Sequence, residues 1–186
     1  MLSEFQTQKW NHFFNILDSN KNDKVTELDF IGIAENLCVL WGYRSGTEEF
    51  DEIVEKGKKI WKDFSSAIPR DEVVEVYRDE MISLAEKLIE ENNVVYFDSL
   101  VEGFVGEVFD LFDSNQDGYI SLDEYVDLFM AYHIEIRYSG KAFTKLDLNG
   151  DDLISKEELW IAVKQYFISD DKEERGNWLF GFWNVA

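Results

Sequence analysis

Apolar side chains recur along this chain at spacings of three and four residues, which places them on one face of an α-helix. Trp10, Phe13, Phe14 and Leu17 form the first such stripe. Similar stripes lie before and after four polar segments, which are residues 18–29, 61–72, 113–124 and 147–158. The pattern predicts four repeated units, each made of a helix, a 12-residue polar loop and a second helix.

The four units divide the chain into two halves. Residues 90–93 interrupt the helical pattern, so we expect one pair of units over residues 1–91 and another over 92–186. An aliphatic residue stands at the eighth position of each predicted loop, as expected where a short β-bridge joins two loops. These residues are Val25, Ile68, Ile120 and Ile154. We therefore predict a compact all-α fold of two paired lobes, and a capping box at Ser3 and Gln6 that starts the first helix.

The third loop, DSNQDGYISLDE, has oxygen-bearing side chains at positions 1, 3, 5, 9 and 12. Ca²⁺ takes about six to eight oxygen ligands, and a 12-residue loop supplies them from those positions and from the backbone carbonyl of position 7. Gly118 stands at position 6, where the loop must turn sharply. The spacing predicts a calcium site in this loop.

The fourth and first loops keep this pattern with two changes. In the fourth, DLNGDDLISKEE, Asp152 replaces glycine at position 6, and we expect modest strain without loss of binding. In the first, DSNKNDKVTELD, Asp23 makes the same replacement and Asp29 stands at position 12. Asp is one methylene shorter than Glu, so bidentate coordination is harder and Mg²⁺ is better tolerated. With two ligand carboxylates against three in each other loop, the first site is expected to be the weakest for calcium.

Three ion sites are therefore predicted. Their ligands are Asp18, Asn20, Asn22, Lys24 and Asp29 in the first loop, Asp113, Asn115, Asp117, Tyr119 and Glu124 in the third, and Asp147, Asn149, Asp151, Leu153 and Glu158 in the fourth. Lys24, Tyr119 and Leu153 stand at position 7 and would each contribute a backbone carbonyl.

The second predicted loop, WKDFSSAIPRDE, keeps the 12-residue length and the aliphatic residue at position 8, but few of the ion ligands. Trp61 offers no oxygen at position 1, and Pro69 follows later in the loop. We expect this loop to pair with the first and to bind no ion, although Asp63, Ser65 and Glu72 could in principle touch a cation.

Composition narrows the partners. The chain has 186 residues, with 18 Lys and Arg against 39 Asp and Glu, and its net charge is −21. This charge argues against nucleic acids and anionic membrane surfaces, and leaves cations as natural partners. The spacing of the loop ligands, rather than the charge, identifies calcium ions among them. Cys38 is the only cysteine, which fits a reducing compartment. The first residues lack the basic and apolar regions of a signal peptide, and no apolar run approaches the roughly 20 residues of a membrane span. We expect a cytoplasmic monomer without stable membrane insertion, and its protein target stays open.

These loops resemble those of EF-hand proteins, and in particular of the sarcoplasmic calcium-binding proteins and calexcitin-like proteins. Asp29 at the end of the first loop, the degenerate second loop and the segment 166–181 carry the resemblance over nearly the whole chain. The resemblance implies a compact two-lobe helical fold, a cytosolic location and calcium buffering. The related calcium-triggered photoproteins also have an inactive second loop, and six Trp, eight Tyr and fifteen Phe would suit their luciferin cavity. This chain ends without their usual C-terminal proline and shows no clear histidine–tryptophan–tyrosine arrangement, so luciferin binding is a minor alternative.

Two other function classes compete with a buffer. An enzyme would need a nucleophile and a base, but Cys38 lies in an apolar helical stretch, and His12 and His133 lie beside aromatic helix faces. We therefore predict no catalytic activity. A calcium sensor would expose a methionine-rich groove, whereas this chain has three methionines and an apolar segment, 178–183, that could cover a groove. The sensor remains the alternative to the buffer.

Overall fold

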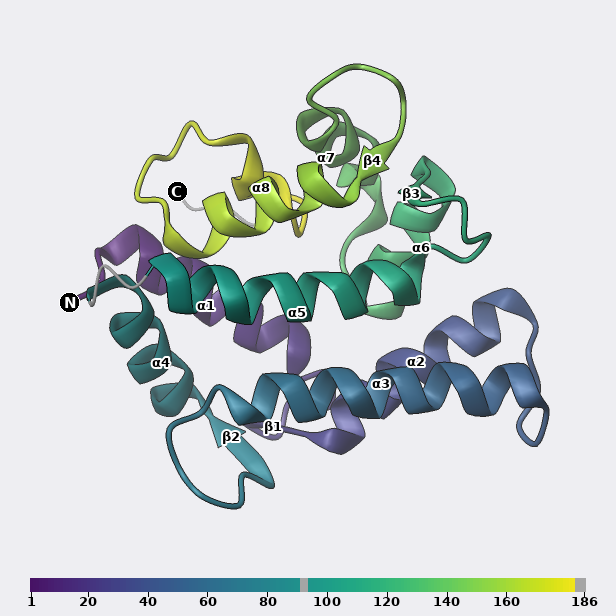
Figure 1. Ribbon diagram of the computed structural model, residues 1–186, viewed down its shortest axis with the longest axis horizontal. Coiled ribbons are helices and arrows are strands. Elements are labelled where there is room, and N and C mark those ends of the chain that lie inside the picture. Colours follow the sequence, from purple (N-terminus) through teal and green to yellow (C-terminus); the bar gives the residue numbers. More distant parts are fainter. Residues whose placement is uncertain (91–93, 183–186) are drawn as a thin grey trace.

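The computed structural model describes residues 1–90 and 94–182 (Figure 1). The elements of the first half are α1 (Glu4–Leu17), β1 (Lys24–Thr26), α2 (Glu27–Trp41), α3 (Glu48–Ser66), β2 (Glu75–Tyr77) and α4 (Arg78–Glu90). Those of the second half are α5 (Val94–Phe112), β3 (Tyr119–Ile120), α6 (Leu122–Ala131), η1 (Ile136–Tyr138), α7 (Ser139–Leu146), β4 (Ile154–Ser155), α8 (Lys156–Ile168) and η2 (Arg175–Trp178). Among the described helices, none has the length and apolar character needed to traverse a bilayer.

Helix starts are set by short-range hydrogen bonds. The Ser3 hydroxyl accepts from the Gln6 N–H at 3.1 Å, and the Gln6 side chain accepts from the Ser3 N–H at 2.9 Å. This reciprocal pair is the predicted capping box, which is confirmed. The same device opens α6 and α8, where the Glu at position 12 of the preceding loop is the reciprocal acceptor.

Short antiparallel strands pair the loops two by two. Val25 of β1 lies opposite Val76 of β2, and Ile120 of β3 lies opposite Ile154 of β4. In Figure 1 the β1–β2 pair lies at the lower edge of the molecule, away from β3 and β4 at the upper right. The predicted all-α fold of four helix-loop-helix units in two lobes is confirmed. The predicted boundary between residues 91 and 92 lies outside the described residues.

The predicted position of the second loop at residues 61–72 is wrong. Helix α3 continues to Ser66, and Trp61 is buried on it, with its ring centroid 5.7 Å from that of Phe30. The residue opposite Val25 is Val76 rather than Ile68. With Val76 at position 8, this loop spans residues 69–80. The apolar stripe of α3 simply runs further than the sequence pattern suggested.

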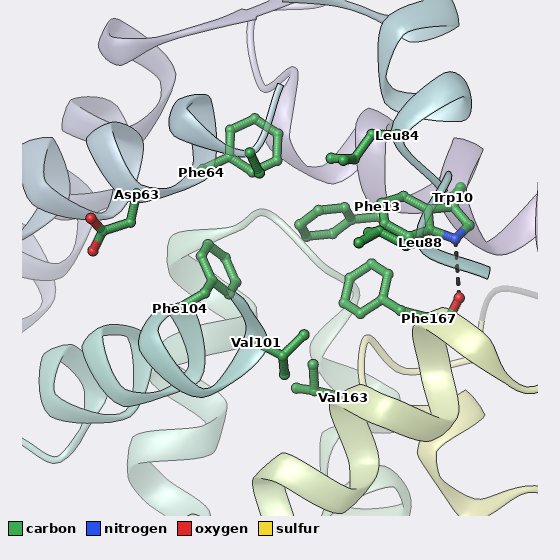
Figure 2. Close-up of a pocket in the computed structure, with 11 residues that line it drawn as sticks. Trp10, Phe13, Asp63, Phe64, Leu84, Leu88, Val101, Phe104, Val163 and Phe167 are labelled. Carbon is green, nitrogen blue, oxygen red and sulfur yellow. Dashed lines mark hydrogen bonds between the residues drawn. The ribbon is translucent and has the colours of Figure 1, made fainter. Parts of the chain in front are cut away.

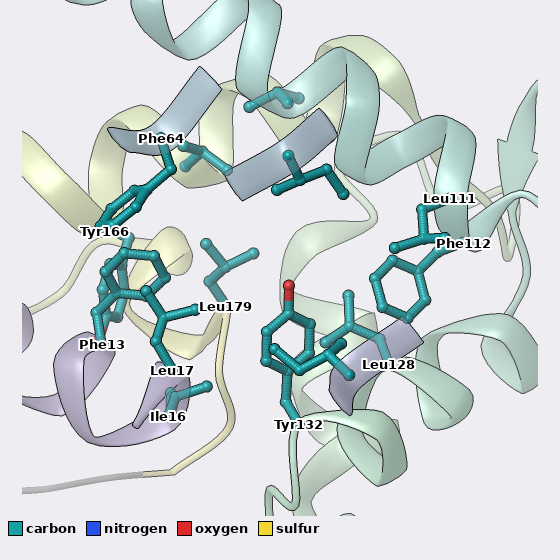
Figure 3. Packing of buried hydrophobic residues seen from close by; sticks show 14 of the residues in the cluster. Phe13, Ile16, Leu17, Phe64, Leu111, Phe112, Leu128, Tyr132, Tyr166 and Leu179 are labelled. Carbon is teal, nitrogen blue, oxygen red and sulfur yellow. The ribbon is translucent and has the colours of Figure 1, made fainter. Parts of the chain in front are cut away.

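One apolar core joins the two lobes. Helix α1 packs against both α4 and α8, α3 packs against α5, and α2 packs against α6. Figure 3 shows part of this core, with Phe13 and Leu17 of α1 on one side and Leu111, Phe112 and Leu128 on the other. The loops therefore project from a scaffold whose helices are held by contacts between lobes as well as within them.

Candidate metal sites

The Asp at position 1 organises the backbone of the first, third and fourth loops. Each of these carboxylates accepts two hydrogen bonds from loop amides. Asp18 accepts from Asn22 and Asp23 at 3.0 and 2.9 Å, Asp113 from Asp117 and Gly118 at 3.1 and 3.0 Å, and Asp147 from Gly150 and Asp152 at 2.7 and 3.0 Å. The loop chain is thereby wrapped around the carboxylate of its first residue.

Positions 3 and 5 continue the same wrapping through side-chain oxygens that accept from the amide two residues on. At position 3, Asn20, Asn115 and Asn149 accept from the amides of Asn22, Asp117 and Asp151 at 3.1, 2.9 and 2.8 Å. At position 5, Asn22, Asp117 and Asp151 accept from the amides of Lys24, Tyr119 and Leu153 at 3.1, 2.9 and 3.0 Å. The predicted side-chain ligands of each loop therefore lie along one curved backbone segment.

The Glu at position 12 ties the end of the third loop to its beginning. One oxygen of Glu124 accepts from the Ser114 N–H at 2.9 Å, and the other accepts from the Ser121 N–H at 2.8 Å. Burial opposes ionisation of this carboxyl, but the hydrogen bonds from Ser121 and Ser114 outweigh it and lower the pKa of Glu124. Glu158 repeats the arrangement at 2.9 Å to the amides of both Leu148 and Ser155, and its pKa is lowered in the same way.

Asp29 fills position 12 of the first loop with a shorter reach. One of its oxygens accepts from the Thr26 N–H at 2.8 Å, as in the other loops. The other oxygen accepts from the side-chain amide of Asn20 at 2.8 Å instead of from a backbone amide near the start of the loop. The shorter side chain of Asp29 thus has a different partner near the start of its loop than Glu124 and Glu158 have.

The backbone at position 6 takes the left-handed conformation in these three loops. Its φ is 61° at Asp23, 85° at Gly118 and 63° at Asp152. Aspartate adopts this conformation more readily than most residues, so the turn is made without glycine in two of the loops.

We expect Gly118→Ala to lower the free energy of unfolding of metal-free protein by about 1–2 kcal/mol, because a Cβ is disfavoured at this φ. No atom lies within 4 Å of the position a Cβ would take, so the loss reports backbone strain rather than a clash. Gly106→Ala, on α5 in the same unit and equally unobstructed, is the matched control and should be neutral or stabilising. Urea unfolding of both variants measures these differences in the free energy of unfolding. Equal stability of the two variants would contradict the claim that Ala strains the backbone at position 118.

The donor atoms of the three loops suit a hard cation. They are carboxylate and amide oxygens, with the carbonyls of Lys24, Tyr119 and Leu153 at position 7, and sulfur and nitrogen ligands are absent from the predicted sets. Within the described residues, no group of three or more His, Cys, Asp and Glu side chains is placed to hold a metal ion. The carboxylates accept hydrogen bonds from loop amides. The other oxygens of each predicted ligand set are the side-chain amide oxygens of Asn and the backbone carbonyl of position 7. Ca²⁺, when bound, would supply positive charge that offsets the repulsion between the carboxylates of one loop.

The groups considered for catalysis are Cys38, His12 and His133, and the two histidines line one pocket together with Asp18 of the first loop. Cys38 is fully buried, and burial raises the pKa of its thiol, which disfavours the reactive thiolate. Burial lowers the pKa of His12 to about 4, so its imidazole is neutral near pH 7. His133 is exposed, with its Nε2 3.2 Å from the side-chain nitrogen of Asn36.

An apolar cavity of about 50 Å³ lies where α1, α3, α4, α5 and α8 meet (Figure 2). Phe13, Phe64 and Phe167 line it, and the Trp10 indole beside it donates to the Phe167 carbonyl at 3.1 Å. Pockets for organic ligands usually measure about 300–1,000 Å³. The cavity is therefore much smaller than a luciferin-sized molecule requires.

Comparison with known proteins gives matches in sequence and in structure. A model of the EF hand domain matches residues 104–132, and a second EF hand model matches residues 141–163. Calexcitin-1 of Caenorhabditis elegans is 27% identical over 182 residues, covering 95% of this chain and 86% of that protein. The coelenterazine-binding protein of Renilla muelleri has the same fold, with a TM-score of 0.77 and 17% identity, covering 97% of this chain and 99% of that one. The sarcoplasmic calcium-binding protein of amphioxus matches with a TM-score of 0.72 and 17% identity, over 99% of this chain and 100% of its own.

Proposed function

We propose that this chain is an EF-hand calcium-binding protein that serves as an intracellular calcium buffer. The two EF hand matches at residues 104–132 and 141–163, the similarity to calexcitin-1 and the fold shared with the amphioxus sarcoplasmic calcium-binding protein support this proposal. It would bind three ions, one each in loops 18–29, 113–124 and 147–158, through the fifteen ligands named above. The first site would also accept Mg²⁺, since Asp29 is bonded differently from Glu124 and Glu158. We further propose that the protein is a cytoplasmic, non-catalytic monomer of two lobes, 1–91 and 92–186; the buried thiol of Cys38 supports the absence of catalysis.

The observation that carries the buffer proposal is the packing of the C-terminal segment. The Tyr125 hydroxyl on α6 donates to the Leu179 carbonyl at 2.8 Å, and the Phe180 ring lies 5.6 Å from that of Phe13 and 5.0 Å from that of Tyr166. A Cβ on Gly176 would lie 2.4 Å from the Ala162 carbonyl oxygen, so the segment approaches α8 as closely as a backbone can. A sensor has to expose the apolar face that these residues cover. Trp183, which the sequence also assigned to the cover, lies outside the described residues.

Methionine placement supports the same proposal. Met81 is fully buried in the core, and Met130 is 40% exposed on α6. A flexible target-binding groove usually gathers several exposed methionines. Luciferin binding, the minor alternative, gains no support from the 50 Å³ cavity. A separate, partly open pocket of about 390 Å³, lined by His12, His133 and Tyr138 among others, falls within the usual volume of ligand pockets and keeps this alternative open. The likeness to the coelenterazine-binding protein supports the fold alone.

Titration of metal-free protein with Ca²⁺, with and without millimolar Mg²⁺, tests this proposal. We expect three binding events in calorimetry, with Mg²⁺ weakening one of them far more than the other two. The fluorescence of a dye that binds exposed apolar surface should change little when calcium is added. Calmodulin, which opens on binding calcium, is the positive control. Fewer than three calcium sites would refute the binding assignment, and a large dye signal would favour the sensor.

A further inference from the structure

The second loop, in its corrected frame 69–80, keeps part of the geometry of the ion-binding loops. Glu72 at position 4 has a φ of 52°, close to the 57° and 58° of Lys21 and Gln116 at position 4 of the first and third loops. Glu80 at position 12 accepts from the Tyr77 N–H at 2.9 Å, as Asp29, Glu124 and Glu158 accept from position 9 of their loops. The loop is therefore folded like its relatives at its outgoing end.

The same loop lacks what an ion needs at its incoming end. Pro69 at position 1 has neither a carboxylate nor an N–H, and Val73 at position 5 has no side-chain oxygen. Val74 at position 6 is β-branched and is absent from the residues with positive φ, so the sharp turn of the other loops is missing. Asp71 keeps a carboxylate at position 3, but a metal ion at this loop would lack the side-chain ligands of positions 1 and 5.

Arg70, at position 2, supplies a positive charge in this loop. Its Nη1 lies 3.1 Å from Glu80 Oε1, and its Nη2 donates to the backbone carbonyl of Glu75. Glu75 and Glu80 stand at positions 7 and 12, whose carbonyl and carboxylate are predicted ion ligands in the other three loops. A guanidinium has several donors in a fixed plane, so one side chain can bind both groups at once.

The strand held by Arg70 faces the first calcium loop. Glu75 pairs with Thr26, and its carboxylate lies 2.8 Å from the Lys24 ammonium across the β1–β2 pair. Lys24 is the residue whose carbonyl is predicted to bind the ion in the first loop. Arg78, two residues beyond Val76, donates to the Asn15 side chain at 2.8 Å on the helix that enters that loop. The second loop thus contacts the first at its strand and at its incoming helix.

We propose that the Arg70 guanidinium is a built-in cation of the second loop, joining positions 7 and 12 where other loops would use a metal ion. It keeps β2 in register against β1 whether or not calcium is present, and so preorganises the first calcium site. This inference rests on the proposed binding of an ion at residues 18–29. Arg70 is a positioning residue in this scheme, because it acts on the first site through β2.

The test compares Arg70→Met and Arg70→Lys with Arg44→Met, which removes the same charge from an exposed arginine in the turn before α3. In calorimetry, Arg70→Met should weaken the first site about threefold to tenfold and leave the third and fourth sites unchanged. Arg70→Lys should fall between, because an ammonium cannot span both partners in a plane. Arg44→Met should match the wild type at every site.

Hydrogen exchange of the β2 amides gives a second readout. In metal-free protein, Arg70→Met should speed exchange at residues 75–77, and Glu80→Gln should do the same. Combining the two substitutions should add little, because both remove one interaction. Unchanged first-site affinity and β2 exchange in Arg70→Met would overturn the inference. Absence of a first site in the wild type would instead refute the proposed function.

Discussion

Glu124→Gln is expected to weaken calcium binding at the third loop by at least about 100-fold, which corresponds to about 2.7 kcal/mol. The substitution keeps the size of the side chain and one carbonyl oxygen, but it removes the charge and the second acceptor oxygen. In the structure both oxygens are in use, toward Ser114 at the start of the loop and Ser121 at its end. Position 12 is also where a calcium loop supplies its bidentate ligand. Calorimetric titration should therefore count one site fewer.

Asp123→Asn is the matched control for this experiment. It removes one negative charge from the adjacent position 11, whose side chain is exposed and is not a predicted ligand. We expect it to reduce calcium affinity only slightly, through the weaker field of the loop. Three unchanged sites in Glu124→Gln would contradict the ligand assignment, and equal losses in both variants would mean that general charge, and not position 12, matters.

The sequence was most informative where ligand chemistry and helix periodicity agree. In the third loop, Asp113, Gly118 and Glu124 stand at spacings that few other structures require, and the structure gives each the expected place at the turn or the loop ends. The capping roles of Ser121 and Glu124 follow from the same spacing. Local chemistry of this kind depends on neighbours within 12 residues, so it can be read without a tertiary structure.

The second loop shows where such reading fails. Without ligands, its frame depended on the apolar pattern, and Trp61 and Phe64 fit a helix as well as a loop boundary. The true frame is set by the pairing of Val76 with Val25, which lies 51 residues earlier in the chain. Arg70 was missed for the same reason, since its partners Glu75 and Glu80 acquire their loop positions only after the frame is corrected. The basic Arg70 directly follows Pro69 in a segment that is poor in ion ligands, and this combination is the signal in the sequence that could have found it.

The contacts between α1 and α8 were also beyond sequence reasoning. Lys9 reads as a surface residue on an amphipathic helix, yet it is fully buried in the structure. Its ammonium donates to the carbonyls of Gln165 and Ser169 at 3.2 and 2.6 Å and to the Asn177 side chain at 3.2 Å. These partners lie more than 150 residues away and include carbonyls at the end of α8, which favour a positive charge.

Lys9→Met is therefore expected to lower the free energy of unfolding by about 2–4 kcal/mol at pH 7, because buried carbonyls of α8 lose their charged donor. Methionine has nearly the same length, so little volume is lost. The exposed Lys145 on α7 provides the control, and Lys145→Met should change stability by less than about 0.5 kcal/mol. Urea unfolding with calcium held at a fixed excess measures both differences.

The pH dependence separates the buried charge from simple packing. Burial lowers the pKa of Lys9 to about 8, although the carboxylates of Asp170 and Glu174 oppose this shift. Its pKa in the unfolded chain is about 10.4, so between these values the unfolded state binds more protons than the folded state. Stability contributed by Lys9 therefore rises with pH across this window. The stability difference between the wild type and Lys9→Met should widen from about pH 8 to about pH 10.5, while other titrating groups cancel in the comparison. A constant difference would show that burial carries no net cost for the ammonium. A difference that shrinks with pH would show that its polar partners stabilise the charged form by more than burial opposes it.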